Sequence, residues 1–305
     1  MIKNYFGHGK LLLTGEYVIL DGSLSLALPT TYGQHFTVEP IEGSRLVWQS
    51  IDDNSNIWFN TEFDLDQLKL TDQINDHDSV TKRLLQILRA AKMLQPEFLD
   101  TDQGYKVSTE LEFPRNWGLG TSSTLIYAMS NWAKIDPYKL LELTFGGSGY
   151  DIACADANSA ITYQLIDKHQ RHITPVDFNP SFKSHLYFVH LNQKQDSRDG
   201  IAQYRAVTSA ITAEISEISN ITKQMLSCDS LETFQKLIEQ HEHLISKLIN
   251  QTPVKQKLFN DFSGSIKSLG AWGGDFILVA SKTDPTDYFK EKGYKTLINY
   301  QSMVF

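Results

Sequence analysis

The stretch that most constrains this chain runs from Pro114 to Leu125, PRNWGLGTSSTL. Two glycines flank a leucine and three hydroxyl residues follow: Gly118, Leu119, Gly120, Thr121, Ser122 and Ser123. Glycine lets the backbone turn tightly and approach a ligand, and hydroxyl residues commonly begin a helix. A glycine turn that feeds a helix N-terminus points several N–H groups at one spot, which favours an anion such as phosphate. The same residues also fit an ordinary strand-turn-helix junction capped by serine.

Length and charge limit the classes of protein that this chain can belong to. Its 305 residues, 41% of them hydrophobic, are many for a single core, so we expect two lobes. The net charge of −8, without a basic block, argues against a nucleic-acid partner, because phosphate backbones are bound by clustered Lys and Arg.

Cysteine usage and hydropathy predict a soluble cytoplasmic protein with no membrane partner. Cys154 and Cys228 lie far apart and form no metal-ligand pattern, which suits a reducing compartment. The N-terminus lacks the features of a signal peptide, and no apolar run approaches the length of a membrane span.

Hydrophobic periodicity predicts a mixture of strands and helices. Strands are expected from Lys10 to Leu20, after an Asp-Gly turn from Ser23 to Leu28, and further along the chain at 34–39, 45–50, 56–60, 105–113, 160–165, 172–177, 185–190 and 276–280. Helices are expected at 79–94, from the glycine stretch through Trp132, and at 137–144, 152–158, 211–225, 231–248 and 254–269.

Three glycine-rich segments carry neighbours that suit phosphoryl transfer: residues 118–123, 146–151 and 270–275. Such a reaction needs a phosphate cradle, a divalent cation, a cation near the developing charge and a group that orients the nucleophile. Lys10, the hydroxyl cluster, Asp151 and Glu142 are candidates for these roles. The chain contains no Walker A sequence and no protein-kinase signature.

In this ordered set the chain resembles the GHMP small-molecule kinases, which include galactokinase, homoserine kinase, mevalonate kinase and phosphomevalonate kinase. The matching segments are Gly9-Lys10 with Gly15-Glu16-Tyr17, Pro114 to Ser122, Gly147 to Asp151, and Lys267 with Gly270 to Gly274. Each segment is weak alone, but they occur in the order and approximate spacing of the family across the whole chain.

The resemblance implies an α+β fold of two lobes with the active site between them. It implies an N-terminal lobe like ribosomal protein S5 domain 2, over residues 1–180, and a ferredoxin-like C-terminal lobe over 181–305. Small molecules would be the partners, and a homodimer is compatible with the family.

The resemblance also implies roles for individual residues. ATP phosphates would bind the 118–123 loop, and Mg²⁺ would bind Ser122 and Glu142, although the spacing from Glu142 to Asp151 is shorter than in mevalonate kinases. Asp151 would orient or deprotonate the acceptor, and Lys10 would stabilise charge beside it. The acceptor itself would meet Glu16, Ser197, Gly273 and Gly274.

Structural interpretations of these residues stay open. Asp151 and Ser122 could each cap a helix, Lys10 could be a solvated strand-end lysine, and Glu142 could be an exposed helix residue. His241 and His243 lie two positions apart on a predicted helix, so they cannot share a face as a metal pair.

Details of the motifs favour phosphomevalonate or mevalonate as the acceptor. Gly15-Glu16-Tyr17 and Gly147 to Asp151 are most similar to phosphomevalonate kinases, and the sugar signature of galactokinases is missing. The alternatives are a homoserine kinase, a diphosphomevalonate decarboxylase, or a non-catalytic relative that binds a nucleotide or metabolite.

Overall fold

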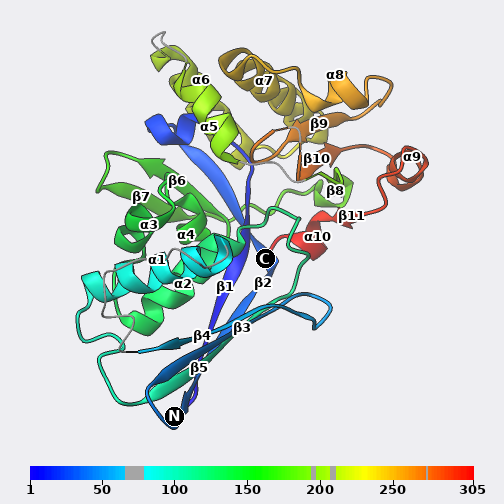
Figure 1. Ribbon diagram of the computed structural model, residues 1–305. Coiled ribbons are helices and arrows are strands. Elements are labelled where there is room, and N and C mark those ends of the chain that lie inside the picture. Colours follow the sequence, from blue (N-terminus) through cyan, green and yellow to red (C-terminus); the bar gives the residue numbers. More distant parts are fainter. Residues whose placement is uncertain (66–78, 194–196, 207–210, 273) are drawn as a thin grey trace. The chain divides into compact units, whose positions relative to one another are not determined.

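The computed structural model describes residues 1–65, 79–193, 197–206, 211–272 and 274–305 (Figure 1). Contacts between residues group the chain into two compact units. Unit 1 comprises Met1–Gly9, Tyr32–Arg115 and Gly120–Asp156, and unit 2 comprises Lys10–Thr31, Asn116–Leu119 and Ala157–Phe305. These groups do not follow the expected boundary at residue 180, which stays a prediction about the two lobes.

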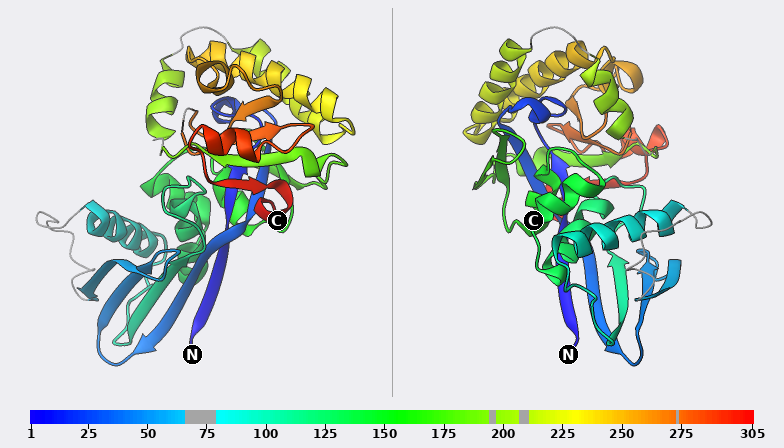
Figure 2. Two further views of the ribbon diagram at one scale, coloured as in Figure 1. Left: turned by 90° about the vertical axis from the view of Figure 1, so that its right-hand side faces the viewer. Right: turned by 60° about the vertical axis from the view of Figure 1, so that its left-hand side comes forward.

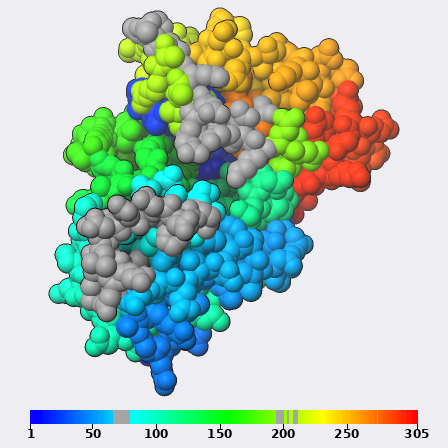
Figure 3. Space-filling model, viewed as in Figure 1, coloured from blue at the N-terminus to red at the C-terminus, as the bar shows by residue number. Residues whose placement is uncertain are grey.

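The sheet of unit 1 has the strand order β4–β3–β5–β2, with β1 also paired to β2. Its strands are β1 (Lys3–Leu12), β2 (Ser25–Ile41), β3 (Arg45–Ile51), β4 (Ile57–Asp64) and β5 (Gly104–Leu111). β3 and β5 run parallel, and the other pairs with given register are antiparallel. In the space-filling view, the blue side chains of β3 and β4 lie at the surface, where Ile57 is 52% exposed (Figure 3).

Helices cover one face of this sheet (Figure 1). They are α1 (Ser79–Leu94), α2 (Thr121–Ala133), α3 (Pro137–Thr144) and α4 (Tyr150–Asp156). Alternate residues of β3, including Leu46 and Trp48, point into a core with Leu88 of α1 and Trp132 of α2. The apolar face of each helix is therefore buried on the sheet, as amphipathic spacing requires.

Unit 2 contains the start of β2 paired with β6 (Ile161–Leu165), which pairs with β7 (Arg171–Pro175). A separate antiparallel sheet has the order β11–β8–β10–β9. Its strands are β8 (Leu186–His190), β9 (Ser265–Ser268), β10 (Phe276–Ala280) and β11 (Leu297–Asn299). All five residues of β10 are buried, as expected for a central strand.

The helices of unit 2 are α5 (Ser197–Arg205), α6 (Thr212–Leu226), α7 (Leu231–Ile249), α8 (Val254–Leu258), α9 (Thr286–Glu291) and α10 (Tyr300–Met303), with short 3₁₀ turns η1 (Val18–Asp21) and η3 (Lys183–His185). Figure 2 shows α6 and α7 side by side, with α7 against β9. A second core of unit 2 centres on Phe259 and Phe289. Among the helices of the described ranges, none has the length and apolar character that a membrane crossing needs.

Several expected elements differ from the observed ones. The strands expected from Ser23 to Leu28 and at 34–39 are parts of one strand, β2, which begins at Ser25. The strand expected from Lys10 to Leu20 ends at Leu12, because Gly15 and Tyr17 have φ of 95° and 66° and turn the chain into η1. The helix expected over 254–269 stops at Leu258, and Ser265–Ser268 instead forms the buried strand β9. The apolar spacing of that segment fits both interpretations, and the pairing partner β10 decides between them.

Candidate active site

The N-terminus of α2 in unit 1 has the geometry of an anion site. Gly120 is its N-cap in the left-handed region, with φ of 97°, and no side chain of the described residues caps the helix. The interpretation of Ser122 as a helix cap is therefore wrong, because Ser122 lies within the first turn of α2. The first turn of α2 also carries no acidic residue. The positive end of a helix that lacks a carboxylate and a side-chain cap leaves its N–H groups available to a phosphate.

The hydroxyl residues of this turn divide into two pairs. Ser123 donates a hydrogen bond to the Gly120 carbonyl at 2.7 Å, and Thr124 donates to Gln34 Oε1 at 2.7 Å. These two buried hydroxyls therefore hold the glycine turn and tie α2 to β2. Thr121 is half-buried and Ser122 is exposed, so Ser122 retains an accessible oxygen, the hard ligand that Mg²⁺ prefers.

Within unit 2, Lys10 contacts the residues that precede Gly120 in the glycine loop, Gly118 and Leu119. Its ammonium donates to the Gly118 carbonyl at 2.7 Å, and its backbone N–H donates to the Leu119 carbonyl at 2.9 Å. The ring of Trp117 packs against Phe276 with centroids 5.3 Å apart, which anchors the same segment to β10. The structure thus brings the predicted catalytic lysine to the predicted phosphate loop and excludes a purely solvated role for it.

Asp275 lies on the other side of Gly118. A Cβ added at Gly118 would lie 2.3 Å from the Asp275 Cγ, so this carboxylate packs directly on the glycine. Asp275 itself has φ of 52°, in the left-handed region. Asp is among the residues that tolerate this region, so the turn does not require a glycine at this position.

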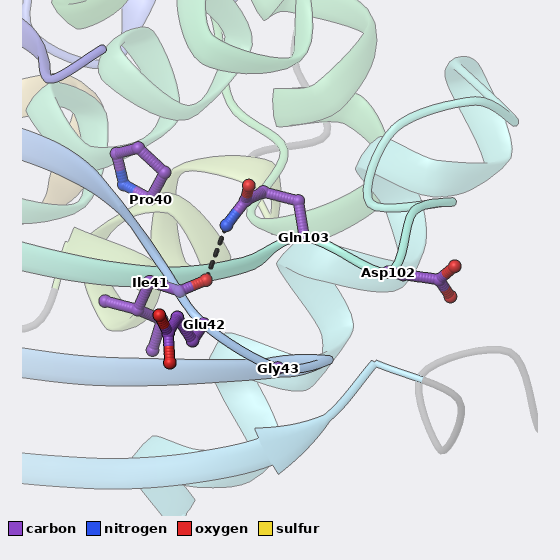
Figure 4. A pocket seen from close by; sticks show the side chains of 6 residues that line it. All are labelled: Pro40, Ile41, Glu42, Gly43, Asp102 and Gln103. Carbon is purple, nitrogen blue, oxygen red and sulfur yellow. Dashed lines mark hydrogen bonds between the residues drawn. The ribbon is translucent and has the colours of Figure 1, made fainter.

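The geometry predicts that Gly118→Ala weakens ATP binding at least about tenfold, because the loop must move to relieve the clash with Asp275. Gly43 provides a matched control, because its φ of 84° is also left-handed but an added Cβ would meet nothing within 4 Å. Figure 4 shows Gly43 in a turn at the end of β2, beside Glu42 and the Gln103 side chain that donates to the Ile41 carbonyl. Each variant should lose about 1 kcal/mol of stability from backbone strain, and Gly118→Ala should lose more because of the clash with Asp275.

Isothermal titration with an ATP analogue and thermal unfolding measure both effects. Equal ATP affinities for Gly118→Ala and Gly43→Ala would contradict a phosphate-binding role for the loop.

Asp151 and Glu142 lie in unit 1 with the helix α2. Asp151 is half-buried in the first turn of α4, where its Oδ1 accepts from the Ile152 N–H at 3.1 Å. Glu142 is exposed on α3. Both helices pack against α2, and the Tyr127 hydroxyl of α2 donates to Asp156 at the end of α4. The structure thus brings together the helices that carry Ser122, Glu142 and Asp151, while their roles stay predictions.

Of three predicted acceptor residues, two lie within the described ranges and one lies outside them. Ser197 begins α5, Gly274 is buried in the loop before β10, and Gly273 lies outside the described residues. The role of these three residues in acceptor binding stays a prediction.

Glu16 lies in a cluster of buried ionisable side chains in unit 2, which we call the buried ionic network: Glu16, His241, Glu242 and Lys267. All are at most 4% exposed. Lys267 donates to Glu16 Oε1 and to the Ser268 carbonyl, and its Nζ lies 3.8 Å from Glu242 Oε1. The Gly15 N–H donates to His241 Nε2 at 3.0 Å. Glu16 is thus engaged by a lysine, and its predicted acceptor contact stays untested.

Burial governs the protonation of this network. Desolvation raises the pKa of Glu16, although Lys267 acts against it, and lowers the pKa of His241 well below its usual value. Burial likewise raises the pKa of Glu242 to about 7, with Lys267 opposing the rise and Glu16 adding to it. His241 is neutral at Nε2, because that atom accepts the Gly15 N–H.

The Glu242 shift predicts a pH-dependent stability. A carboxyl whose pKa is raised from 4.5 to about 7 on folding stabilises the protein below pH 4.5, and this contribution is lost as pH rises through 7. At pH 8 this shift lowers the free energy of unfolding by on the order of 3 kcal/mol. We therefore compare the free energy of unfolding of Glu242→Gln with that of wild type. The difference should favour the variant more at pH 8 than at pH 5.

Urea unfolding of both proteins at the two pH values measures this difference. His241 has the opposite sign, because its lowered pKa costs stability toward low pH, but it is present in both proteins and cancels. Glu217→Gln, at an exposed site on α6, is the control and should show no such change. A difference between Glu242→Gln and wild type that is the same at pH 5 and pH 8 would contradict the assigned shift.

Comparison with known proteins places the fold. No protein-family model and no curated sequence matches the chain. The mevalonate kinase of Methanococcus jannaschii superposes with a TM-score of 0.69 at 16% identity, covering 98% of both chains. The phosphomevalonate kinase of Streptococcus pneumoniae, solved with phosphomevalonate and AMPPNP, gives a TM-score of 0.70 at 16% identity, covering 97% of this chain and 99% of that one. The chain has the GHMP kinase fold.

A third enzyme with the GHMP kinase fold, the galactokinase of Lactococcus lactis solved with galactose, gives a TM-score of 0.65 at 14% identity, covering all of this chain and 93% of that one. The predicted α+β fold class and the resemblance are therefore confirmed at the level of the fold. Because three kinases with different acceptors match almost equally well, the fold alone does not select the acceptor.

Proposed function

We propose that this chain catalyses ATP-dependent phosphoryl transfer to a small isoprenoid precursor, phosphomevalonate or mevalonate. The observation that carries the proposal is the contact of Lys10 with the Gly118 carbonyl, in a loop that feeds the uncapped N-terminus of α2. A cation and a row of backbone N–H groups on one loop suit a triphosphate donor, since phosphoryl transfer depends on positioning and electrostatic stabilisation.

The residues present fit a magnesium ion. Ser122 and Glu142 offer accessible oxygens on α2 and α3, and Mg²⁺ usually takes one or two carboxylates together with substrate phosphates. Within the described ranges no group of three or more His, Cys, Asp and Glu side chains is placed to hold a metal. When bound, the ion would neutralise charge on the transferred phosphoryl group.

The protein side chains have separate tasks in this proposal. Lys10 stabilises negative charge that develops at the terminal phosphate, and Asp151 orients or deprotonates the acceptor. A hydroxyl acceptor is a poor nucleophile at neutral pH and depends strongly on such a base, whereas a phosphate acceptor is already ionised.

A parallel assay of the purified protein tests the proposal. ATP consumption is measured with mevalonate, phosphomevalonate, homoserine and galactose, and the phosphorylated product is identified by mass spectrometry. We expect turnover with one of the first two compounds. Turnover with homoserine or galactose alone would show that the proposed acceptor is wrong and that the compound consumed is the acceptor. ATP binding without any turnover would favour the non-catalytic alternative.

A further inference from the structure

The buried ionic network connects two segments of unit 2 that are 251 positions apart in the sequence. Glu16 follows β1, whose residue Lys10 contacts the glycine loop, and Lys267 is in β9, just before the loop 270–275. Burying two charges is costly, and an apolar pair of similar size is often equally stable. Stability alone therefore gives no reason for an ion pair here. A need to hold the two segments in one defined geometry does give such a reason.

The turn that carries Glu16 is fixed on several sides. A Cβ at Gly15 would lie 2.0 Å from Ser25 Oγ, so only glycine fits there. Thr14 and Thr222 of α6 share a hydrogen bond of 2.7 Å between their hydroxyls, and His241 of α7 accepts the Gly15 N–H. Lys267 of β9 holds the Glu16 side chain from a further side, so the turn is fixed by contacts from β2, α6, α7 and β9.

The loop that follows Lys267 returns to the phosphate loop. Gly270 has φ of 62°, and the Asp275 carboxylate packs on Gly118. Asp275 is held by two backbone hydrogen bonds of 2.7 Å, to Leu191 and Gln193. Gly118 in turn accepts from Lys10. Asp275 directly precedes Phe276, whose carbonyl accepts at 3.3 Å from the N–H of Leu269, two residues after Lys267. These contacts, together with the chain from Lys10 to Glu16, form a closed circuit through Gly118, Asp275, Lys267 and Glu16.

We propose that Glu16 and Lys267 are positioning residues, whose ion pair closes this circuit and holds the Lys10 ammonium against the glycine loop. The inference rests on the proposed function. Glu16 and Lys267 are 1% and 0% exposed, so they act through Lys10 and do not touch a substrate.

The test removes both charges at once. Lys267→Met alone leaves the Glu16 carboxylate buried without a cation and is expected to fold poorly. The double variant Glu16→Gln with Lys267→Met removes both charges of the pair, and below pH 7 the remaining carboxyl of the network, Glu242, is protonated because burial raises its pKa to about 7. Measured below pH 7, the double variant is expected to fold with a thermal midpoint near that of wild type. Its kcat should fall about 100-fold, as for a misplaced catalytic group, while KM for ATP and acceptor changes little.

Two further measurements separate positioning from stability. Phe289→Leu, in the second core of unit 2, lowers stability without touching the circuit and should keep the wild-type kcat. The acetylation rate of Lys10, followed by mass spectrometry relative to exposed Lys3, should rise in the double variant, because the ammonium is no longer held on Gly118.

The outcomes are distinct. A double variant that folds and keeps the kcat and the Lys10 reactivity of wild type would overturn the inference while leaving the proposed function intact. An equal loss of kcat in Phe289→Leu would also overturn it, since instability would then explain the effect. A wild-type protein that phosphorylates none of the acceptors would instead overturn the proposed function.

Discussion

Asp151→Asn is expected to lower kcat with a hydroxyl acceptor by about 100- to 10,000-fold, the usual contribution of a general base. The amide of asparagine keeps an oxygen that can accept the Ile152 N–H, which Asp151 Oδ1 accepts at 3.1 Å. The first turn of α4 should therefore remain intact, and the thermal midpoint should change little. With a phosphate acceptor the loss should be smaller, because that nucleophile is already ionised.

Steady-state kinetics and thermal unfolding of the purified variant measure these effects. Asp156→Asn is the matched control, because it changes an exposed carboxylate at the other end of the same helix, where it accepts from the Tyr127 hydroxyl. This control should keep the wild-type kcat. If Asp151→Asn also kept nearly normal turnover with both acceptors, Asp151 would be only a helix-capping residue.

Lys10→Met is expected to lower kcat about 100- to 1,000-fold, the typical effect of removing one donor that stabilises transition-state charge. The side chain is partly buried and its ammonium donates to the Gly118 carbonyl, so methionine preserves most of the packing and removes the charge. KM for ATP should rise much less than kcat falls, because the backbone N–H groups at the start of α2 remain.

Lys3→Met is the control for Lys10→Met. It removes the same charge from an exposed position at the start of β1, seven positions before Lys10 on the same strand. Initial rates at saturating ATP compare the two variants. Equal rates for both would show that Lys10 contributes nothing beyond net charge.

The parts of the fold that depend on local pattern were predictable from the sequence. The helix expected at 79–94 is α1 with the same ends, because Leu84, Leu88 and Ala91 repeat on one face. The helix expected at 137–144 is α3 with the same ends, since the Asp136 side chain caps Tyr138 N–H and Pro137 occupies the first turn. Both signals lie within a few residues of the element that they define.

The parts that depend on distant partners were not predictable. All four residues of β9 are buried, including Lys267, and a lysine in a short segment gives no local sign that it forms a buried strand. Its counter-ion Glu16 is 251 positions away, so only the fold brings them together. His241 was correctly separated from exposed His243 by helical spacing, but its contact with Gly15 had no sequence signal.

The candidate site shows the same division. The glycine turn and a helix that begins there were expected from Gly118, Gly120 and the hydroxyl cluster, but the N-cap is Gly120 and not a hydroxyl residue. The contact of Lys10 with this loop follows from the family resemblance and not from spacing, since 108 positions separate Lys10 from Gly118. The packing of Asp275 on Gly118 could not be foreseen, because it depends on the left-handed turn at Asp275.

A crystal structure of the protein with AMPPNP and Mg²⁺ tests the central claim most directly. The account predicts that the β- and γ-phosphates accept hydrogen bonds from the N–H groups of residues 120–123 at the start of α2, and that the Lys10 ammonium lies within hydrogen-bond distance of the terminal phosphate. A nucleotide bound elsewhere, or phosphates that leave the α2 N-terminus uncontacted, would contradict it.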